Sequence, residues 1–273
     1  MLSDITDEKD TLIALLESEW KSLEELCTPL TLKEWNTPTE CPNWTVRDCL
    51  AHLIGVEHRL LGRGVPSVLL SDTSHVRNEQ GLKNEIDVVS RRSETIEQIL
   101  EEFRGVNSER LNVLNSQSDF GSEADSPAGR GTFYDQVSVR IFDCWIHEQD
   151  IRRAIGKPGN LTGAVAERSF ERIIKVMPFV FGKKVGAPEG SSVKFRIDGD
   201  FCCDVYVQMK EARGELVPEL LDPTTEITMD PETFICLSCG RWDPQVALNG
   251  GKVSIKGDRQ LGVSIVTEMN YMV

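Results

Sequence analysis

The chain has 273 residues, of which 40% are hydrophobic, so it can bury a sizeable core and form two domains of ordinary size. Its formal net charge is −14, which argues against binding to nucleic acid or to an anionic membrane surface. No run of about 18 apolar residues occurs, so no membrane span is predicted. The acidic start MLSDITDEKD differs from a signal peptide, and we therefore expect a cytoplasmic protein.

The first two thirds of the chain has apolar residues at spacings of three and four, the pattern of amphipathic helices. Thr45 is the expected N-cap of one of these helices, and Gly62 follows its end. Residues 65–82 and the Ser/Gly/Asp-rich segment 116–132 are predicted loops. The predicted helices are, in chain order, 5–27, 31–35, 45–61, 84–103 with a continuation through 104–116, 133–155 and 163–181.

The pattern changes after residues 182–192, a Gly/Pro/Ser segment typical of a linker. Alternating β-branched residues then predict strands, and Pro and Gly mark the ends of a short helix. The predicted strands are 193–198, 203–209, 226–230 and 252–258, and the predicted helices are 231–240 and 259–272. The fold class is therefore predicted to be α+β, with a helical bundle over 1–181 and a smaller α+β domain over 193–273.

A candidate metal site comes from two of the predicted helices. Asp143 and His147 are four residues apart and share one helix face, where their side chains can close on one ion. His52 lies in the middle of another helix, about ninety residues earlier. Three ligands with an open fourth position are typical of catalytic rather than structural zinc. The alternatives are a solvent-facing Asp143–His147 pair and a His52 that is only a core residue.

Further polar residues near this pattern are candidates for substrate binding or for orienting a ligand. Arg140 and Arg241 are predicted to hold a carboxylate, since a guanidinium binds carboxylates with two hydrogen bonds, although surface ion pairs are the simpler alternative. Asp150 or Glu148 would orient a ligand histidine from outside the site. Arg47 and Arg152 are further candidate carboxylate binders, Trp44 and Trp145 are expected to be core anchors, and His58 and His75 are expected to lie outside the site.

The eight cysteines include one C-x-x-C motif, Cys236–Cys239. A lone motif of this kind is weak evidence for redox chemistry or for zinc. In a cytoplasmic chain of this length, we expect reduced cysteines in the core rather than a disulfide framework.

Two segments resemble one known family. CPNWTVRDCLAHL (41–53) and RIFDCWIHEQDIRRAIGKPG (140–159) are similar to the signature stretches of the mycothiol-dependent maleylpyruvate isomerase family, within the DinB-like metal-binding four-helix bundles. Residues 240–262 resemble the sterol-carrier-like domain of such proteins. The resemblance implies a metal on His52, Asp143 and His147. The isomerase proper has Glu where this chain has Asp143, which is one bond, or ~1.5 Å, shorter.

These observations predict a metal-dependent enzyme in which zinc, with nickel as the alternative, holds mycothiol or a similar thiol as a thiolate. Its partners would be this thiol and a small electrophile that undergoes isomerisation or S-transfer. A metal-bound hydroxide and hydrolysis, an apolar-ligand carrier without catalysis, and a metal-dependent sensor are the alternatives. No nucleic acid or membrane partner is expected, and the oligomeric state is left open between monomer and homodimer.

Overall fold

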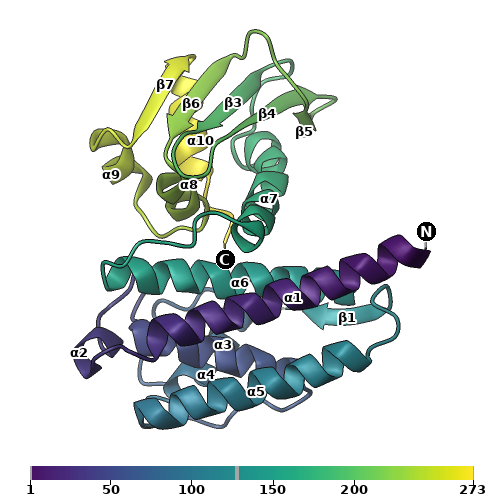
Figure 1. Ribbon diagram of the computed structural model, residues 1–273. Helices are drawn as coiled ribbons and strands as arrows, with labels where there is room; N and C mark the ends of the chain where they lie inside the picture. Colours follow the sequence, from purple (N-terminus) through teal and green to yellow (C-terminus); the bar gives the residue numbers. More distant parts are fainter. Residues whose placement is uncertain (1, 127–128, 273) are drawn as a thin grey trace. The chain divides into compact units, whose positions relative to one another are not determined.

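The computed structural model describes residues 2–126 and 129–272, which fold into two compact units. The first comprises the chain up to Asn160 together with residues 164–168, and the second comprises residues 161–163 and Ser169–Met272. The first is largely helical and the second is built on a sheet, so the predicted α+β class is confirmed (Figure 1). Among the described residues, no helix combines the length and apolar character that a membrane crossing requires.

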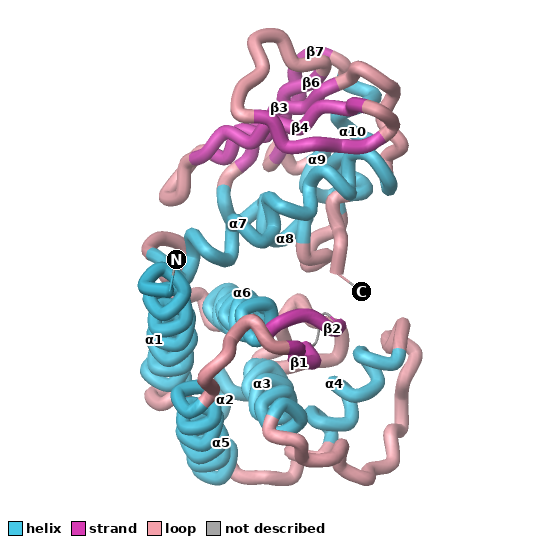
Figure 2. The backbone as a smooth tube through the Cα atoms, turned by 90° about the vertical axis from the view of Figure 1, so that its right-hand side faces the viewer, coloured by secondary structure: helices cyan, strands magenta, loops and turns pink. Residues whose placement is uncertain are grey.

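The first unit is a four-helix bundle with two shorter helices. Its helices are α1 (Leu2–Cys27), α2 (Leu32–Trp35), α3 (Val46–Leu60), α4 (Glu79–Val89), α5 (Ile96–Ser116) and α6 (Phe133–Ala154). Both α1 and α3 pack against α5 and α6, so these four helices surround a common core (Figure 2). Leu23, Phe103 and Trp145 are almost completely buried in it. The predicted bundle helices 5–27, 45–61 and 133–155 agree with α1, α3 and α6 to within a few residues.

One predicted helix of this unit is wrong. Residues 79–116 form α4 and α5, separated by residues 90–95, whereas one helix over 84–103 with a continuation through 104–116 was predicted. The start of α4 at Glu79 also lies inside the predicted loop 65–82. A capping box at Thr95 starts the second helix: the Thr95 hydroxyl accepts from the Gln98 amide, and the Gln98 side chain accepts from the Thr95 amide. These reciprocal bonds satisfy the exposed backbone donors at a helix start, so they favour a break where apolar periodicity alone favours continuation.

The predicted loop 116–132 contains a hairpin that the sequence analysis missed. Strand β1 (Glu123–Ser126) pairs antiparallel with β2 (Gly129–Thr132), and Glu123 lies opposite Thr132. Residues 127–128 lie outside the described residues. Both strands lack the β-branched alternation that predicts a strand, and Gly129 has φ of +107°, which glycine adopts without strain.

The second unit is a five-stranded sheet with helices on one side (Figures 1 and 2). Its strands are β3 (Ser192–Ile197), β4 (Cys203–Lys210), β5 (Arg213–Val217), β6 (Thr225–Met229) and β7 (Val253–Gly257), in the order β5-β4-β3-β6-β7. Only the β3–β6 pair is parallel among these neighbours. The helices are α7 (Ala164–Phe179), the π-helix η1 (Val180–Lys184), α8 (Pro231–Ser238), α9 (Pro244–Asn249) and α10 (Arg259–Glu268).

Strand β5 and helix α9 were not predicted. β5 is an edge strand that pairs with β4, and its residues are exposed or half-buried, so it carries no apolar alternation. α9 spans six residues and starts at a proline capped by Asp243. The four predicted strands correspond to β3, β4, β6 and β7. Alternate residues are buried in β3, β4 and β6, and β7 buries Val253 and half-buries Ile255, so each strand has a period-two pattern in its sequence.

The compact units divide at residues 161–169, whereas the sequence analysis places the domain boundary inside 182–192. From Ser169 onward α7 belongs to the second unit, where the Phe170 ring stacks on Phe201 at 3.9 Å and lies 6.4 Å from Phe234. The π-helix that follows packs on β5. A Cβ at Gly182 would come within 2.7 Å of the Gly214 backbone nitrogen. Gly182 therefore allows close packing, although the composition of residues 182–192 resembles that of a linker.

A buried pair of carboxyl groups in the bundle gives a first testable prediction. Burial, and then hydrogen bonding to Glu148 and the charge of Glu148, raise the pKa of Glu19 well above its usual value. The folded protein therefore keeps a proton that the unfolded chain releases. This stabilising contribution is complete below the unfolded pKa of about 4.3 and is lost as the pH rises through the folded value.

We expect Glu19→Gln to weaken this pH dependence, because glutamine keeps the shape and hydrogen bonds of the acid without ionising. Thermal unfolding followed by circular dichroism at about pH 5 and pH 8 should show a smaller loss of stability for the variant than for the wild type. Glu17→Gln, at an exposed position of α1, is the matched control. Equal losses for Glu19→Gln and wild type would contradict the prediction.

Candidate metal centre

Two capped helices position the candidate ligands. Thr45 and Asp48 form a capping box at the start of α3, with the Thr45 amide donating to Asp48 at 2.9 Å, so the predicted N-cap is confirmed. Thr132 and Asp135 form the same motif at the start of α6. The cap fixes where each helix begins, and the packing of α3 against α6 then sets which faces meet. His52 lies two turns into α3, and Asp143 and His147 lie in the middle of α6.

The three predicted ligands do meet. His52 Nε2 is 3.3 Å from Asp143 Oδ2, and His147 Nε2 is 3.7 Å from Asp143 Oδ1. One donor atom from each of the three residues lies within 4.8 Å of the others. The histidine side chains are only 4% and 7% exposed, whereas that of Asp143 is 16% exposed, so the cluster is most open on the carboxylate side.

The donor set fits a divalent metal. Two imidazoles and one carboxylate are ligands that zinc uses in catalytic sites. Within the described residues, the buried Nδ1 of His52 has no hydrogen-bond partner, so this ring is held on one side only. Burial lowers the pKa of His52 to about 4 and leaves it neutral at pH 7, as a metal ligand must be.

His147 and Asp143 have pKa values shifted by their neighbours. Burial lowers the pKa of His147, but hydrogen bonds to Asp150 and Cys41 and the charge of Asp143 outweigh it and raise the pKa to about 10. Burial raises the pKa of Asp143, but the charge of Arg140, followed by His52, holds it well below its usual value. Asp143 is therefore ionised, and a metal that binds His147 must displace a proton from this ring.

Groups outside the ligand set fix its orientation. Asp150 Oδ2 lies 3.1 Å from His147 Nδ1, so Nε2 of this ring is directed toward Asp143. Arg140 forms an ion pair with Asp143 and, through Nε, a 2.7 Å contact with Glu57. Arg140 is fully buried, which favours a positioning role for it over the substrate-binding role predicted from the sequence.

Trp44 also lies at this site, although it was predicted to be a core anchor. Its ring centroid is 5.1 Å from that of His52 and 5.8 Å from that of His147. The indole N–H donates to Glu85 on α4 at 2.9 Å, and this bond sets the orientation of the ring. Trp44 is half-buried and covers one side of the histidine pair. Trp145 is fully buried in the bundle, as predicted.

Other candidate residues lie elsewhere. Glu148 accepts hydrogen bonds from Arg152 at 2.7 Å and from Ser22 on α1 at 2.9 Å, so it belongs to the α1–α6 contact. Arg47 donates to backbone carbonyls of the segment between α4 and α5. Arg241 belongs to the second unit and donates to the Cys239 carbonyl at 3.0 Å, and its catalytic role stays a prediction. Cys236 and Cys239 are both buried.

Glu57 is the main residue of this site that the sequence analysis missed. It is 1% exposed and pairs with Arg140 at 2.7 Å and with Arg110 at 3.2 Å. A signal was available in the sequence, since Glu57 directly follows the apolar run 53–56 in the middle of a predicted helix. A buried glutamate needs a cation beside it. Arg140, one turn before Asp143, is a candidate for that cation.

Comparisons with known proteins agree with this architecture. The family profile of the mycothiol maleylpyruvate isomerase N-terminal domain matches residues 16–152, and that of the SCP-2 sterol transfer family matches residues 182–267. A crystal structure of the mycothiol-dependent maleylpyruvate isomerase is similar with a TM-score of 0.58 and 12% identity, over 91% of this chain and 92% of that one. A mutant of that enzyme gives 0.57 and 11% over the same shares. The search of curated proteins found no match.

The fold defines a helical bundle that contains the donor cluster, followed by a sterol-carrier-like unit. The chain belongs to the mycothiol-dependent maleylpyruvate isomerase family. At 12% identity, the likeness to the solved enzyme concerns the fold alone.

Proposed function

We propose that this chain is a metal-dependent enzyme that uses a low-molecular-weight thiol, mycothiol or a similar one, on a small electrophile. The observation that carries the proposal is the convergence of His52, Asp143 and His147 from two helices, with the carboxylate side more open than the rest. Family membership supports the same thiol chemistry. The reaction is an isomerisation or an S-transfer.

Zinc suits the two imidazoles and the carboxylate, with nickel as the alternative. When bound, such a metal lowers the pKa of a coordinated thiol, ordinarily about 8.5 for a cysteine-like thiol, so that a thiolate is present at neutral pH. The ligands themselves are held by the protein: Asp150 directs the ring of His147, and Arg140 directs the carboxylate of Asp143. Trp44 covers the histidines and limits access of water.

The thiolate explains both proposed reactions. Its sulfur adds to one carbon of an activated double bond, the remaining single bond rotates, and the C–S bond breaks to return the thiolate. This sequence is a cis–trans isomerisation with no net change in atoms. If the adduct is protonated on carbon instead, the thiol stays attached and the reaction is an S-transfer.

A cavity in the first unit supports an anionic substrate. It has a volume of about 270 Å³, and its lining includes Arg59, Arg63 and Lys83, with Asp125 as an acidic member. Val56, one helical turn beyond His52 on α3, also lines it. Arg59, Arg63 and Lys83 also pair with carboxylates, those of Asp87, Glu109 and Glu79 respectively, so a substrate carboxylate would bind here by sharing or replacing these partners.

The proposal is tested with the cobalt-substituted protein. Adding mycothiol or another cellular thiol should increase the sulfur-to-cobalt charge-transfer absorption in the near ultraviolet, measured as a difference spectrum. His52→Ala should lose this increase, whereas His58→Ala, on the same helix but paired with Glu102 and outside the candidate ligand group, should keep it. A wild-type spectrum that no thiol changes would sink the thiol-dependent function and move hydrolysis ahead.

We expect Arg63→Ala to raise the KM for a carboxylate-bearing substrate by about tenfold, the effect of losing about 1.5 kcal/mol from one charged hydrogen bond. kcat should change little, because Arg63 is not among the candidate ligands. Arg104→Ala is the control, since Arg104 makes an exposed pair with Glu24. Steady-state kinetics measure KM and kcat for both variants. An unchanged KM for Arg63→Ala would show that Arg63 does not bind the substrate.

The match of residues 182–267 to the SCP-2 sterol transfer family supports a second candidate, a carrier of an apolar ligand. Binding of a fluorescent sterol to the full chain, together with the absence of any thiol response, would favour this candidate. A thiol response without sterol binding would favour the enzyme.

A further inference from the structure

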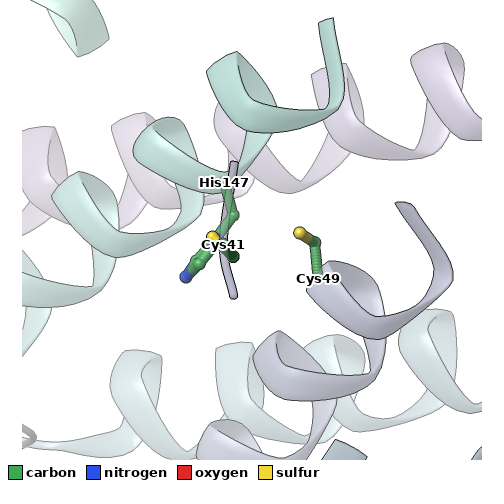
Figure 3. A group of neighbouring side chains, drawn as sticks. All are labelled: Cys41, Cys49 and His147. Atoms are coloured by element: carbon green, nitrogen blue, oxygen red, sulfur yellow. The ribbon is translucent and has the colours of Figure 1, made fainter. Parts of the chain in front are cut away.

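A second cluster of metal-binding atoms lies on the far side of the His147 ring. Cys41 precedes α3 in the loop that the Pro38–Thr45 bridge closes, and Cys49 lies in the first turns of α3. The two sulfurs and one ring nitrogen of His147 all lie within 4.8 Å of one another, and Figure 3 shows the sulfur of Cys49 facing Cys41 and the histidine. All three residues are buried.

Asp150 supplies a fourth donor. Its Oδ2 lies 3.2 Å from Cys41 Sγ and 3.1 Å from His147 Nδ1, and Cys41 Sγ lies 3.9 Å from the same nitrogen. In a tetrahedral zinc site with bonds of about 2.0–2.3 Å, neighbouring ligand atoms are separated by about 3.3–3.8 Å. The separations among Cys41, Asp150 and His147, 3.1–3.9 Å, are close to this range, and Cys49 Sγ lies within 4.8 Å of Cys41 Sγ and the His147 ring nitrogen.

We infer that Cys41, Cys49, Asp150 and Nδ1 of His147 form a second, closed metal site for a thiophilic divalent cation such as zinc or cadmium. Two sulfurs favour such ions over magnesium or calcium, and four protein ligands are typical of a structural site. This site goes beyond the proposed function, whose metal uses the opposite ring nitrogen of His147.

The charges and protons of this site balance. Two thiolates and one carboxylate carry three negative charges, and the metal contributes two positive charges. The remaining negative charge is balanced by Arg153, which donates to Asp150 Oδ1 at 2.5 Å, while the metal binds Oδ2. On binding, the thiols of Cys41 and Cys49 release their protons to solvent, as does Nδ1 of His147.

Sharing one imidazole couples the two sites. A ring that ligates a metal through each nitrogen has lost both N–H protons, so filling both sites requires an imidazolate. The second metal should therefore bind more weakly when the first is present. Removing His52 leaves all four ligands of the second site in place, whereas removing Cys49 leaves all three ligands of the first.

The test is the charge-transfer spectrum of the full chain with cobalt and no added thiol. Wild type should show sulfur-to-cobalt absorption in the near ultraviolet, Cys49→Ser should weaken it, the double variant Cys41→Ser/Cys49→Ser should lose it, and His52→Ala should keep it. Cys27→Ser is the matched control, because Cys27 is equally buried but belongs to neither ligand group found among the described residues. Far-ultraviolet circular dichroism checks that each variant is folded.

A wild-type protein without this absorption overturns the second site, whatever the variants do. Absorption that survives in Cys41→Ser/Cys49→Ser also overturns it, because its sulfur would then come from outside the proposed site. Absorption that disappears in His52→Ala overturns it too, because the sulfur would then bind the first metal. The outcome is separable from that of the proposed function: a thiol-induced difference spectrum with no intrinsic absorption keeps the function and rejects only the second site.

Discussion

Replacing His147 by alanine should abolish both metal binding and thiol-dependent activity. His147 presents one nitrogen toward Asp143, at 3.7 Å, and the other toward Asp150, at 3.1 Å. Removing an outer partner of a metal ligand typically costs 10–100-fold in metal affinity, so removing the ligand itself should cost at least about 100-fold. Metal content measured by mass spectrometry after mild chelation should fall to the background level.

Two comparisons make this result specific. His52→Ala should also lose the metal of the first site, since His52 supplies its third donor. His75→Ala should keep full metal content, because His75 contacts Glu85 at 3.0 Å and belongs to neither ligand group of the described residues. If His147→Ala and His52→Ala both retain full metal content after chelation, then the assignment of the first site is wrong.

The helices that carry this site could be predicted because their sequences contain independent signals that agree. α3 has apolar periodicity and a Thr45–Asp48 capping box, and α6 has periodicity and Thr132–Asp135. The two signals conflict between α4 and α5, where the apolar pattern continues through a strong cap at Thr95. The edge strand β5 has neither signal, because its pairing with β4 leaves its side chains largely exposed.

The proximity of two candidate ligands was predictable, since spacing within one helix fixes the relation of Asp143 to His147. The approach of His52 depends instead on how α3 packs against α6. Contacts between elements were harder, because they depend on how each helix is rotated and where a loop runs. The loop carrying Cys41 and Trp44 passes beside α6 only because of tertiary packing. Arg140 shows the limit most clearly: its position on the polar arc was predicted, but its partner Glu57 comes from another helix and was not.

Arg140→Met should be strongly destabilising, by about 3–5 kcal/mol, the usual cost of removing one partner of a buried ion pair. Arg140 is fully buried between Glu57 and Asp143. Methionine fills a similar volume but leaves these carboxylates without their main counter-charge, although Arg110 still reaches Glu57 at 3.2 Å. Chemical denaturation monitored by circular dichroism measures the change in the free energy of unfolding.

The double variant Glu57→Gln/Arg140→Met separates lost packing from uncompensated charge. If charge is the cause, neutralising Glu57 should recover part of the loss, and the two substitutions should be non-additive by more than about 0.5 kcal/mol. Arg104→Met is the control, because its exposed pair with Glu24 should contribute at most about 1 kcal/mol. A loss of less than about 1 kcal/mol for Arg140→Met would mean that water or a rearranged side chain replaces the guanidinium. Arg140 would then not be what holds Asp143 in position.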